Sequence, residues 1–269
     1  MGIGTHAVFN GEIILTEEAT LPVTRREVQC NYSVYESLKV SNGKPLFVNE
    51  HIQRLENSAL GLGFRLEEKS QDLVQWIEKL IKEDSIEKAT LRILLVGGNP
   101  QLLYITAQSI LTYPKSCYKN GVIASIFEGE RYLPTLKTSN LLVNYLALEK
   151  GKKEQNAFEA VLMDRYGRLI EGTRSNFYGI KDKVLYTPGL DLVLSGITRD
   201  NVLKVSKNLG YEIKMDEYVT LDNIATFDEF FISSTSMLAM PLRQLGQREM
   251  ERGFEKTLEI YSHLKSLES

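Results

Sequence analysis

The chain has 269 residues, with 32 Lys and Arg against 35 Asp and Glu, which gives a formal net charge of −3. A hydrophobic content of 43% with 25% charged residues is typical of globular proteins and excludes the disordered and fibrous classes. Apolar runs of about 18 residues are absent, so we expect no membrane-spanning helix. The slightly acidic balance argues against non-specific nucleic-acid binding, which requires a basic surface.

Two further features bound the class of protein. The first 13 residues combine neither a basic region nor an apolar core, so no secretory signal is expected. Cys30 and Cys117 are too few and too far apart for a disulfide framework or a zinc site, and the three histidines show no metal-ligand spacing. We therefore expect a cytoplasmic protein that holds no metal.

The first ~115 residues predict an α+β unit. Asn10-Gly11 and Asn42-Gly43 each separate two short β-type runs, and Asn-Gly favours the type I′ turn of a hairpin. Asn49 is a predicted N-cap of a helix in which apolar residues recur at helical spacing. Further elements expected here are a helix over 71–83, with Leu73, Ile77, Leu80 and Ile81 on one face, and strands over 90–95 and 102–107.

A polar segment over 113–121, rich in turn formers, is the predicted linker. Beyond it we expect a helix over 140–152 with Leu141, Tyr145 and Leu148 on one side, and a helix that starts at Gly196. The strands expected in this half are 122–127, 160–163, 176–180, 183–186 and 230–233. The pattern predicts two α+β domains, 1–115 and 121–269, with a cleft between them.

Several residues suggest chemistry, although each has an ordinary structural explanation. Glu171, in EGTRSN at 171–176, can point into a cleft or simply cap a turn between two strands. Gly196-Ile197-Thr198 at a helix start offers free N–H groups to an anion, although most helix starts bind nothing. The hydroxyl run 233–236 can donate to the same anion or form a polar turn.

Two basic residues are equally ambiguous by themselves. Arg54 lies beside the apolar face of its predicted helix, where an arginine either extends to solvent or binds a phosphate in bidentate fashion. Lys137, in LKTSN at 136–140, is by default a surface lysine. These residues indicate a function only if a known protein family uses all of them in one site.

One family does combine them. The sequence resembles the fold-type IV pyridoxal-phosphate enzymes, which include branched-chain aminotransferases, D-amino-acid aminotransferases and aminodeoxychorismate lyase. Nearly the whole chain shares the resemblance, which implies a two-domain α+β fold with the cofactor in the interdomain cleft, and a homodimer. The blocks that carry it are VYESLKV at 34–40, VNEHIQRL at 48–55, LKTSNL at 136–141, IEGTRSN at 170–176, LYTP at 185–188, LSGITR at 194–199 and FISSTS at 231–236.

The resemblance also implies roles for individual residues. Lys137 matches the lysine that forms a Schiff base with pyridoxal phosphate and moves the substrate Cα proton. Glu171 matches the acid that binds the pyridine nitrogen, where a carboxylate would hold the proton that lets the ring accept electrons. The implied phosphate ligands are Arg54, Ile197, Thr198 and Thr235.

The substrate is less determined by the resemblance, which assigns Tyr35 and Ser236 to the substrate pocket together with the Gly97-Gly98 turn. Leu141 stands where branched-chain enzymes usually have a tyrosine, and the run 97–101 lacks the cation with which D-amino-acid aminotransferases bind the substrate carboxylate. Arg174 faces either the substrate carboxylate or solvent. We predict an aminotransferase for a small or apolar amino acid and a 2-oxo acid, with aminodeoxychorismate lyase and a non-catalytic phosphate-binding protein as the alternatives.

Overall fold

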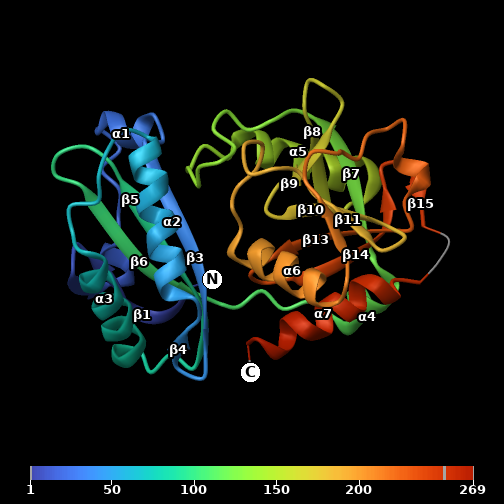
Figure 1. Cartoon of the computed structure of the whole chain (residues 1–269). Coiled ribbons are helices and arrows are strands. Elements are labelled where there is room, and N and C mark those ends of the chain that lie inside the picture. The colour runs from blue at the N-terminus through green and yellow to red at the C-terminus, as the bar shows by residue number, and fades with distance from the viewer. Residues whose placement is uncertain (1, 251–252, 269) are drawn as a thin grey trace. The chain divides into compact units, whose positions relative to one another are not determined.

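The computed structural model describes residues 2–250 and 253–268. The chain folds into two compact units, coloured along the sequence in Figure 1. Unit 1 comprises Met1–Leu111 and Leu136–Asn140, and unit 2 comprises Thr112–Thr135 and Leu141–Ser269. The domain ranges 1–115 and 121–269 stay a prediction; the structure adds that the short segment containing Lys137 belongs to unit 1.

Unit 1 is an antiparallel sheet with helices against it (Figure 1). Its strands are β1 (Gly2–Phe9), β2 (Glu12–Leu15), β3 (Ser33–Ser41), β4 (Lys44–Pro45), β5 (Lys88–Val96) and β6 (Leu102–Gln108), and its helical segments are η1 (Thr16–Glu18), α1 (Arg26–Gln29), α2 (Val48–Gly61) and α3 (Ser70–Glu83). The strand order is β2-β1-β6-β5-β3-β4. Apolar residues of α2 and α3 pack with those of one sheet face into a single core, and the predicted buried face of α3 is confirmed.

The two predicted hairpins of unit 1 are confirmed. Asn10 and Gly11 have φ of 44° and 89°, and Asn42 and Gly43 have φ of 51° and 72°, the positive values that a type I′ turn requires. The predicted N-cap of α2 is wrong: the helix begins at Val48, and Phe47, with φ of 54°, precedes it. A left-handed residue turns the chain from β4 into the helix, so Asn49 already lies inside the first turn.

Unit 2 contains a nine-stranded mixed sheet. Its strands are β7 (Val122–Glu128), β8 (Glu159–Met163), β9 (Leu169–Gly172), β10 (Asn176–Lys181), β11 (Val184–Tyr186), β12 (Glu212–Lys214), β13 (Glu229–Ser234), β14 (Leu238–Leu245) and β15 (Arg248–Glu249). The order is β12-β11-β10-β13-β14-β7-β8-β9, with β15 paired to β14. An additional pairing of β9 with β10 joins six of these strands into a closed ring.

The helices of unit 2 correct two sequence predictions. They are α4 (Lys115–Asn120), α5 (Leu142–Gln155), α6 (Ile197–Asn208), η2 (Ile224–Thr226) and α7 (Glu255–Ser266). The predicted linker contains α4, and Cys117 and Tyr118 of that helix pack on the core. The predicted apolar side of α5 is also wrong, because the buried residues are Asn144, Ala147 and Gly151, while Tyr145 is exposed.

Close packing explains the buried side of α5. A Cβ added to Gly151 would clash with Ser125 Oγ, so small residues let this helix approach the sheet closely. Within the described part of the chain, no helix is long and apolar enough to cross a membrane.

Candidate functional site

Lys137 lies in unit 1 beside the start of β3. Thr138 forms an antiparallel bridge with Val34, and Tyr35 N donates to the Lys137 carbonyl at 3.0 Å. The Lys137 N–H donates to Ser58 Oγ at 3.1 Å, so α2 and β3 together fix the backbone of this lysine. Its ammonium lies 4.8 Å from the centre of the Tyr35 ring. The structure therefore brings two of the predicted site residues, Lys137 and Tyr35, into contact.

Arg92 approaches the same ring. The Arg92 guanidinium carbon lies 4.2 Å from the centre of the Tyr35 ring, within the range of a cation–π interaction. Tyr35 and Arg92 alternate with strand residues whose side chains enter the core under α2, so both lie on the sheet face away from that core. Arg92 was not predicted from the sequence, because it lies inside an otherwise apolar strand pattern and belongs to none of the motifs.

Arg54, a predicted phosphate ligand, is held by a buried carboxylate. Its Nε donates to Glu36 Oε1 and its Nη2 donates to Glu36 Oε2, both at 2.7 Å. His51, one turn before Arg54 on α2, places its Nδ1 2.7 Å from Glu36 Oε2. Glu36 thus orients the arginine from β3, and phosphate binding by Arg54 stays a prediction.

Burial and neighbouring charges together determine the protonation of Glu36 and His51. Burial alone would raise the pKa of Glu36, but the Arg54 charge, the hydrogen bonds from Arg54 and His51, and the nearby Lys137 charge outweigh it and lower the pKa to about 2. Burial lowers the pKa of His51, against the opposing effect of Glu36. At neutral pH the cluster therefore consists of an anionic Glu36, a cationic Arg54 and a neutral His51.

The Arg25 side chain contacts the 97–101 loop, whose Gly97-Gly98 turn was predicted to line the substrate pocket. Arg25 Nη1 donates to the Pro100 carbonyl at 2.9 Å and Nη2 to the Gly97 carbonyl at 3.3 Å. Gly98 has φ of 104°, and a Cβ there would lie 2.6 Å from Arg25 Nη2. The run 97–101 carries no cation of its own, so no local pattern indicated that the Arg25 guanidinium lies against it.

Glu171 lies in unit 2 with a partner that the sequence did not reveal. It is part of β9 itself, whereas the sequence predicted a position between two strands. Arg131 Nε donates to Glu171 Oε1 at 2.6 Å, Arg131 Nη2 donates to Oε2 at 3.2 Å, and both side chains are buried. The two residues are 40 positions apart, and no motif or spacing indicates this pair.

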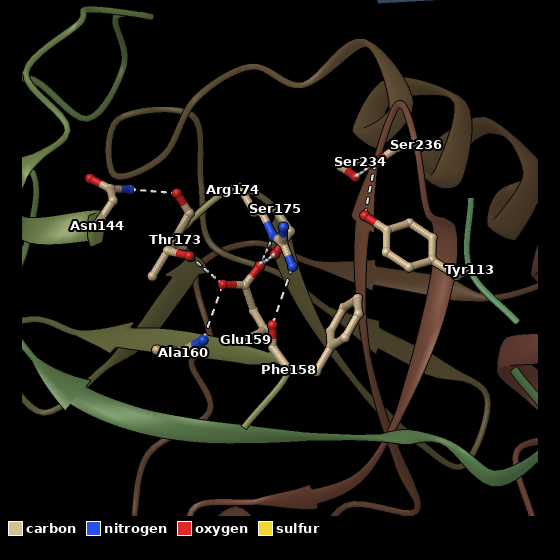
Figure 2. A network of polar contacts seen from close by, with 10 residues as sticks. All are labelled: Tyr113, Asn144, Phe158, Glu159, Ala160, Thr173, Arg174, Ser175, Ser234 and Ser236. Atoms are coloured by element: carbon tan, nitrogen blue, oxygen red, sulfur yellow. Dashed lines mark hydrogen bonds and ion pairs between the residues drawn. The ribbon is translucent and has the colours of Figure 1, made fainter. Parts of the chain in front are cut away.

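A short turn after Glu171 is held by a second buried carboxylate, Glu159 at the start of β8 (Figure 2). Glu159 accepts hydrogen bonds from Thr173 N at 3.1 Å, from the Thr173 hydroxyl, and from Ser175 Oγ at 3.1 Å. Gly172 N donates to the Ser175 carbonyl, which closes the turn between β9 and β10. Glu159 therefore fixes the strand connection that carries Glu171.

Arg174 occupies the tip of that turn. Its guanidinium lies 5.2 Å from the Phe158 ring centre, its Nη2 donates to the Phe158 carbonyl at 3.3 Å, and its Nε is 3.7 Å from Glu159 Oε2. The side chain is 40% exposed, so it combines contacts to Phe158 with partial exposure to solvent. Figure 2 shows Phe158 between Arg174 and Tyr113, and the Tyr113 hydroxyl lies 3.4 Å from Ser236 Oγ.

Asn176 connects Glu171 with the start of α6. It pairs with Glu171 across the β9–β10 turn and with Ser233 of β13. Its Nδ2 donates to the Leu194 carbonyl at 3.0 Å, and a Cβ on Gly196 would clash with its Oδ1. A side chain at position 196 would displace the Asn176 amide, and the predicted helix is confirmed, with Gly196 as its N-cap and Ile197 as its first residue.

The start of α6 and the turn after β13 supply donors for an anion. Gly196 provides no side-chain cap, so the first N–H groups of α6 face outward from the helix end. Among residues 2–250 and 253–268, the Thr198 and Thr235 hydroxyls form no hydrogen bond with another residue. Threonine hydroxyls and the N–H groups of a helix N-terminus are donors of the kind that bind phosphate, and their joint role in one site stays a prediction.

Comparisons with known proteins identify the family. The family model for amino-transferase class IV matches residues 33–245. This chain belongs to that family. It is 30% identical to a probable branched-chain-amino-acid aminotransferase of Rickettsia felis over 245 residues, which cover 86% of this chain and 84% of the relative. It is 32% identical to a D-alanine aminotransferase of Staphylococcus aureus over 279 residues, which cover 94% and 98%.

The fold agrees with this class IV assignment. The structure of a T.th. branched-chain amino acid aminotransferase with pyridoxamine 5′-phosphate superposes with a TM-score of 0.91 at 22% identity, over 99% of this chain and 94% of that one. The expected α+β fold is confirmed. The chain is therefore a class IV aminotransferase, an enzyme that moves amino groups.

The residues of this chain fit pyridoxal phosphate, the cofactor that the family implies. The hydroxyls of Thr198 and Thr235, which have no hydrogen-bond partner among the described residues, suit the phosphate, and the glycine at 196 leaves room at the helix start. Glu171 offers a carboxylate for the pyridine nitrogen, and Lys137 offers an amine for the aldehyde. These are the chemical groups that such a cofactor needs.

Proposed function

We propose that this chain is a pyridoxal-phosphate-dependent aminotransferase that exchanges an amino group between a small or apolar amino acid and a 2-oxo acid. The observation that carries the proposal is the buried Arg131–Glu171 ion pair. A carboxylate with a permanent counter-charge stays anionic in a buried site, as it must to hold a proton on a pyridine nitrogen. Family membership supplies the reaction class, and this pair supports the cofactor.

Each predicted residue then has a defined task. When bound, the cofactor supplies the electron sink that makes the substrate Cα proton acidic. Lys137 is the covalent attachment point, and its amine carries the proton to and from Cα. Glu171 binds the pyridine nitrogen, and Arg54, Ile197, Thr198 and Thr235 bind the phosphate.

The substrate contacts are proposed from unit 1 and unit 2 separately. Tyr35 and Ser236 face the substrate, as the resemblance implies. We add Arg92 as the group that binds a substrate carboxylate, because its guanidinium lies over the ring that Lys137 also contacts and no described carboxylate pairs with it. Relatives with branched-chain and D-alanine names match about equally well, so they support the reaction and leave the substrate open. We also propose a cytoplasmic homodimer, which the family resemblance supports.

An absorption spectrum tests the proposal. The purified protein supplied with pyridoxal phosphate should become yellow, and borohydride should fix the cofactor on Lys137, as peptide mass mapping would show. A panel of L- and D-amino acids should then bleach the colour for the true donor, with 2-oxo acid formed in equal amount. Lys137→Ala should keep the fold and lose both colour fixation and turnover; Lys150→Ala, an exposed lysine of α5, is the matched control.

Two results would count against the proposal. A protein that takes up no pyridoxal phosphate would leave a binding protein without catalysis as the better explanation. Pyruvate and 4-aminobenzoate formed from 4-amino-4-deoxychorismate, with no amino-acid donor active, would instead favour the lyase.

A further inference from the structure

Arg199 is a buried cation to which the described part of the chain offers no acidic partner. It lies in the first turn of α6 and is 1% exposed. Its Nη2 donates to the Pro188 carbonyl at 2.7 Å and lies 3.7 Å from Met215 Sδ, while its buried Nε has no partner. In residues 2–250 and 253–268, no carboxylate forms an ion pair with it. An arginine is protonated under all ordinary conditions, so a full positive charge is buried here.

The neighbours of Arg199 do not neutralise this charge. Burial raises the pKa of Tyr178, whose hydroxyl lies 2.9 Å from Ser233 Oγ, so that phenol stays neutral. Asp200, the next residue, is exposed and forms no ion pair with Arg199. The contacts of Arg199 are a carbonyl oxygen and a thioether, which hydrogen-bond a guanidinium without offsetting its charge.

The Arg199 charge adds to the positive end of the α6 dipole. The N-terminus of a helix already carries about half a positive charge, and the Arg199 side chain begins beside it, because a Cβ added to Gly196 would lie 3.2 Å from Arg199 Cβ. A buried, uncompensated cation is costly, and breaking or omitting its partner is destabilising. An anion at the start of α6 would interact favourably with both positive contributions, and in a buried environment such interactions are weakly screened.

We propose that Arg199 is a positioning residue that supplies, without touching the ligand, the buried positive charge that retains a phosphate dianion at the start of α6. The inference rests on the proposed function, because the phosphate belongs to the proposed cofactor. It deepens that function by assigning part of the phosphate affinity to a residue outside the hydrogen-bonding set of Thr198 and Thr235. The selectivity should therefore be for a phosphate monoester over the same compound without phosphate.

The test compares ligands with and without the phosphate group. Dissociation constants of pyridoxal 5′-phosphate, pyridoxal and inorganic phosphate are measured on the full-length, cofactor-stripped protein and three variants. Arg199→Met removes the charge at similar size, Arg199→Lys keeps the charge without the planar hydrogen-bonding group, and Lys204→Met removes an exposed charge of the same helix. Circular dichroism and thermal unfolding check the fold.

Arg199→Met should weaken pyridoxal 5′-phosphate and inorganic phosphate by about tenfold or more and change pyridoxal by less than about twofold. Arg199→Lys should retain most of the phosphate affinity, and Lys204→Met should change nothing. Equal weakening of pyridoxal 5′-phosphate and pyridoxal, or unchanged phosphate binding, would overturn the inference. If Arg199→Met does not fold, Arg199→Lys decides alone, because loss of phosphate affinity there would show that the hydrogen bond to Pro188 matters and the charge does not.

Failure of the proposed function gives a different pattern. A wild-type protein that binds inorganic phosphate but no pyridoxal 5′-phosphate would refute the cofactor, and the phosphate arm of Arg199→Met would still decide the role of Arg199. A wild-type protein that binds neither ligand would refute both.

Discussion

Arg131 and Glu171 form a buried two-point ion pair, with Arg131 Nε 2.6 Å from Glu171 Oε1 and Nη2 3.2 Å from Oε2. The side chains are 7% and 5% exposed, so both charges have left water. Such a pair is stable only when its geometry is good and its remaining donors are satisfied, and Arg131 Nη2 also donates to the Pro134 carbonyl. The pair therefore gives Glu171 a fixed position and a lasting counter-charge.

Removal of Arg131 should impair the function of Glu171 by favouring its neutral form, although Glu171 itself is not substituted. In Arg131→Met the carboxyl stays buried with no counter-charge, a state that favours its neutral form. We expect kcat to fall by at least about tenfold and unfolding stability to fall by about 3–5 kcal/mol. Steady-state kinetics and thermal unfolding measure the two effects, with Arg165→Met as control, because Arg165 forms an exposed pair with Glu130.

A double variant separates stability from catalysis. Arg131→Met combined with Glu171→Gln removes both charges and should regain part of the lost stability while turnover stays low. Normal kcat in Arg131→Met would show that Glu171 needs no counter-charge from this arginine.

The contrast between these two residues shows what the sequence could and could not predict. The hairpins at Asn10-Gly11 and Asn42-Gly43 follow from turn chemistry within four residues and could be predicted, whereas Glu171 belongs to a local motif whose role stays a prediction. Arg131 reaches Glu171 across 40 residues, and Arg92 reaches Tyr35 between strands that are paired through the sheet. Contacts of this kind depend on strand order, which no local pattern encodes.

Two predictions based on the distribution of apolar residues were wrong: the buried side of α5 and the linker over 113–121. Helix α5 buries Asn144, Ala147 and Gly151, and close approach to the sheet favours such small side chains, so its large apolar residues Leu142, Tyr145 and Leu146 are exposed instead. The segment 113–121 looked like a linker because its polar residues obscure Tyr113, Cys117 and Tyr118, which pack on the core.

Acid should destabilise unit 1 through Glu36 and His51. The pKa of Glu36 is lowered from its ordinary 4.5 to about 2, so its contribution to stability is complete above pH 4.5 and is lost as the pH falls from 4.5 toward 2. The contribution is on the order of 3 kcal/mol. The pKa of His51 is lowered from 6.5, so the unfolded chain binds a proton at a higher pH than the folded chain does. Stability therefore begins to fall below pH 6.5.

Denaturant unfolding between pH 8 and 3 measures this dependence. Glu36→Gln should lower stability at pH 7, because Arg54 loses its counter-charge, and should flatten the curve below pH 4.5. Glu50→Gln changes an exposed carboxylate of α2 and should leave the curve unchanged. A Glu36→Gln curve parallel to that of the wild type would show that other carboxylates cause the acid loss.

Glu159 should stabilise the fold by holding the β9–β10 turn that follows Glu171. In Glu159→Gln the amide group would face the Thr173 and Ser175 donors, so at least one buried donor loses its acceptor. We expect a loss of about 1–3 kcal/mol in unfolding stability, together with weaker cofactor retention as the β9–β10 turn loosens. Calorimetry and cofactor release rates provide the readouts.

Glu149→Gln is the matched control for Glu159→Gln, since Glu149 is an exposed residue that pairs with Lys152. It should change neither stability nor cofactor release. A Glu159→Gln protein as stable as the control would mean that the turn is held by its backbone hydrogen bonds alone.

Arg92 should determine affinity for substrates through their carboxylate. An arginine that binds a carboxylate contributes about 1.5–3 kcal/mol, so Arg92→Met should raise KM for the amino acid and for the 2-oxo acid by about tenfold or more. Cofactor affinity should stay unchanged, because the proposed phosphate and pyridine contacts do not include Arg92. An amine donor without a carboxylate, if accepted, should react equally well with both proteins, whereas a wrongly folded site would slow it too. Lys88→Met, at an exposed position of the same strand, controls for the loss of one positive charge. An unchanged KM in Arg92→Met would show that another residue, such as Ser236 or Arg174, binds the substrate carboxylate.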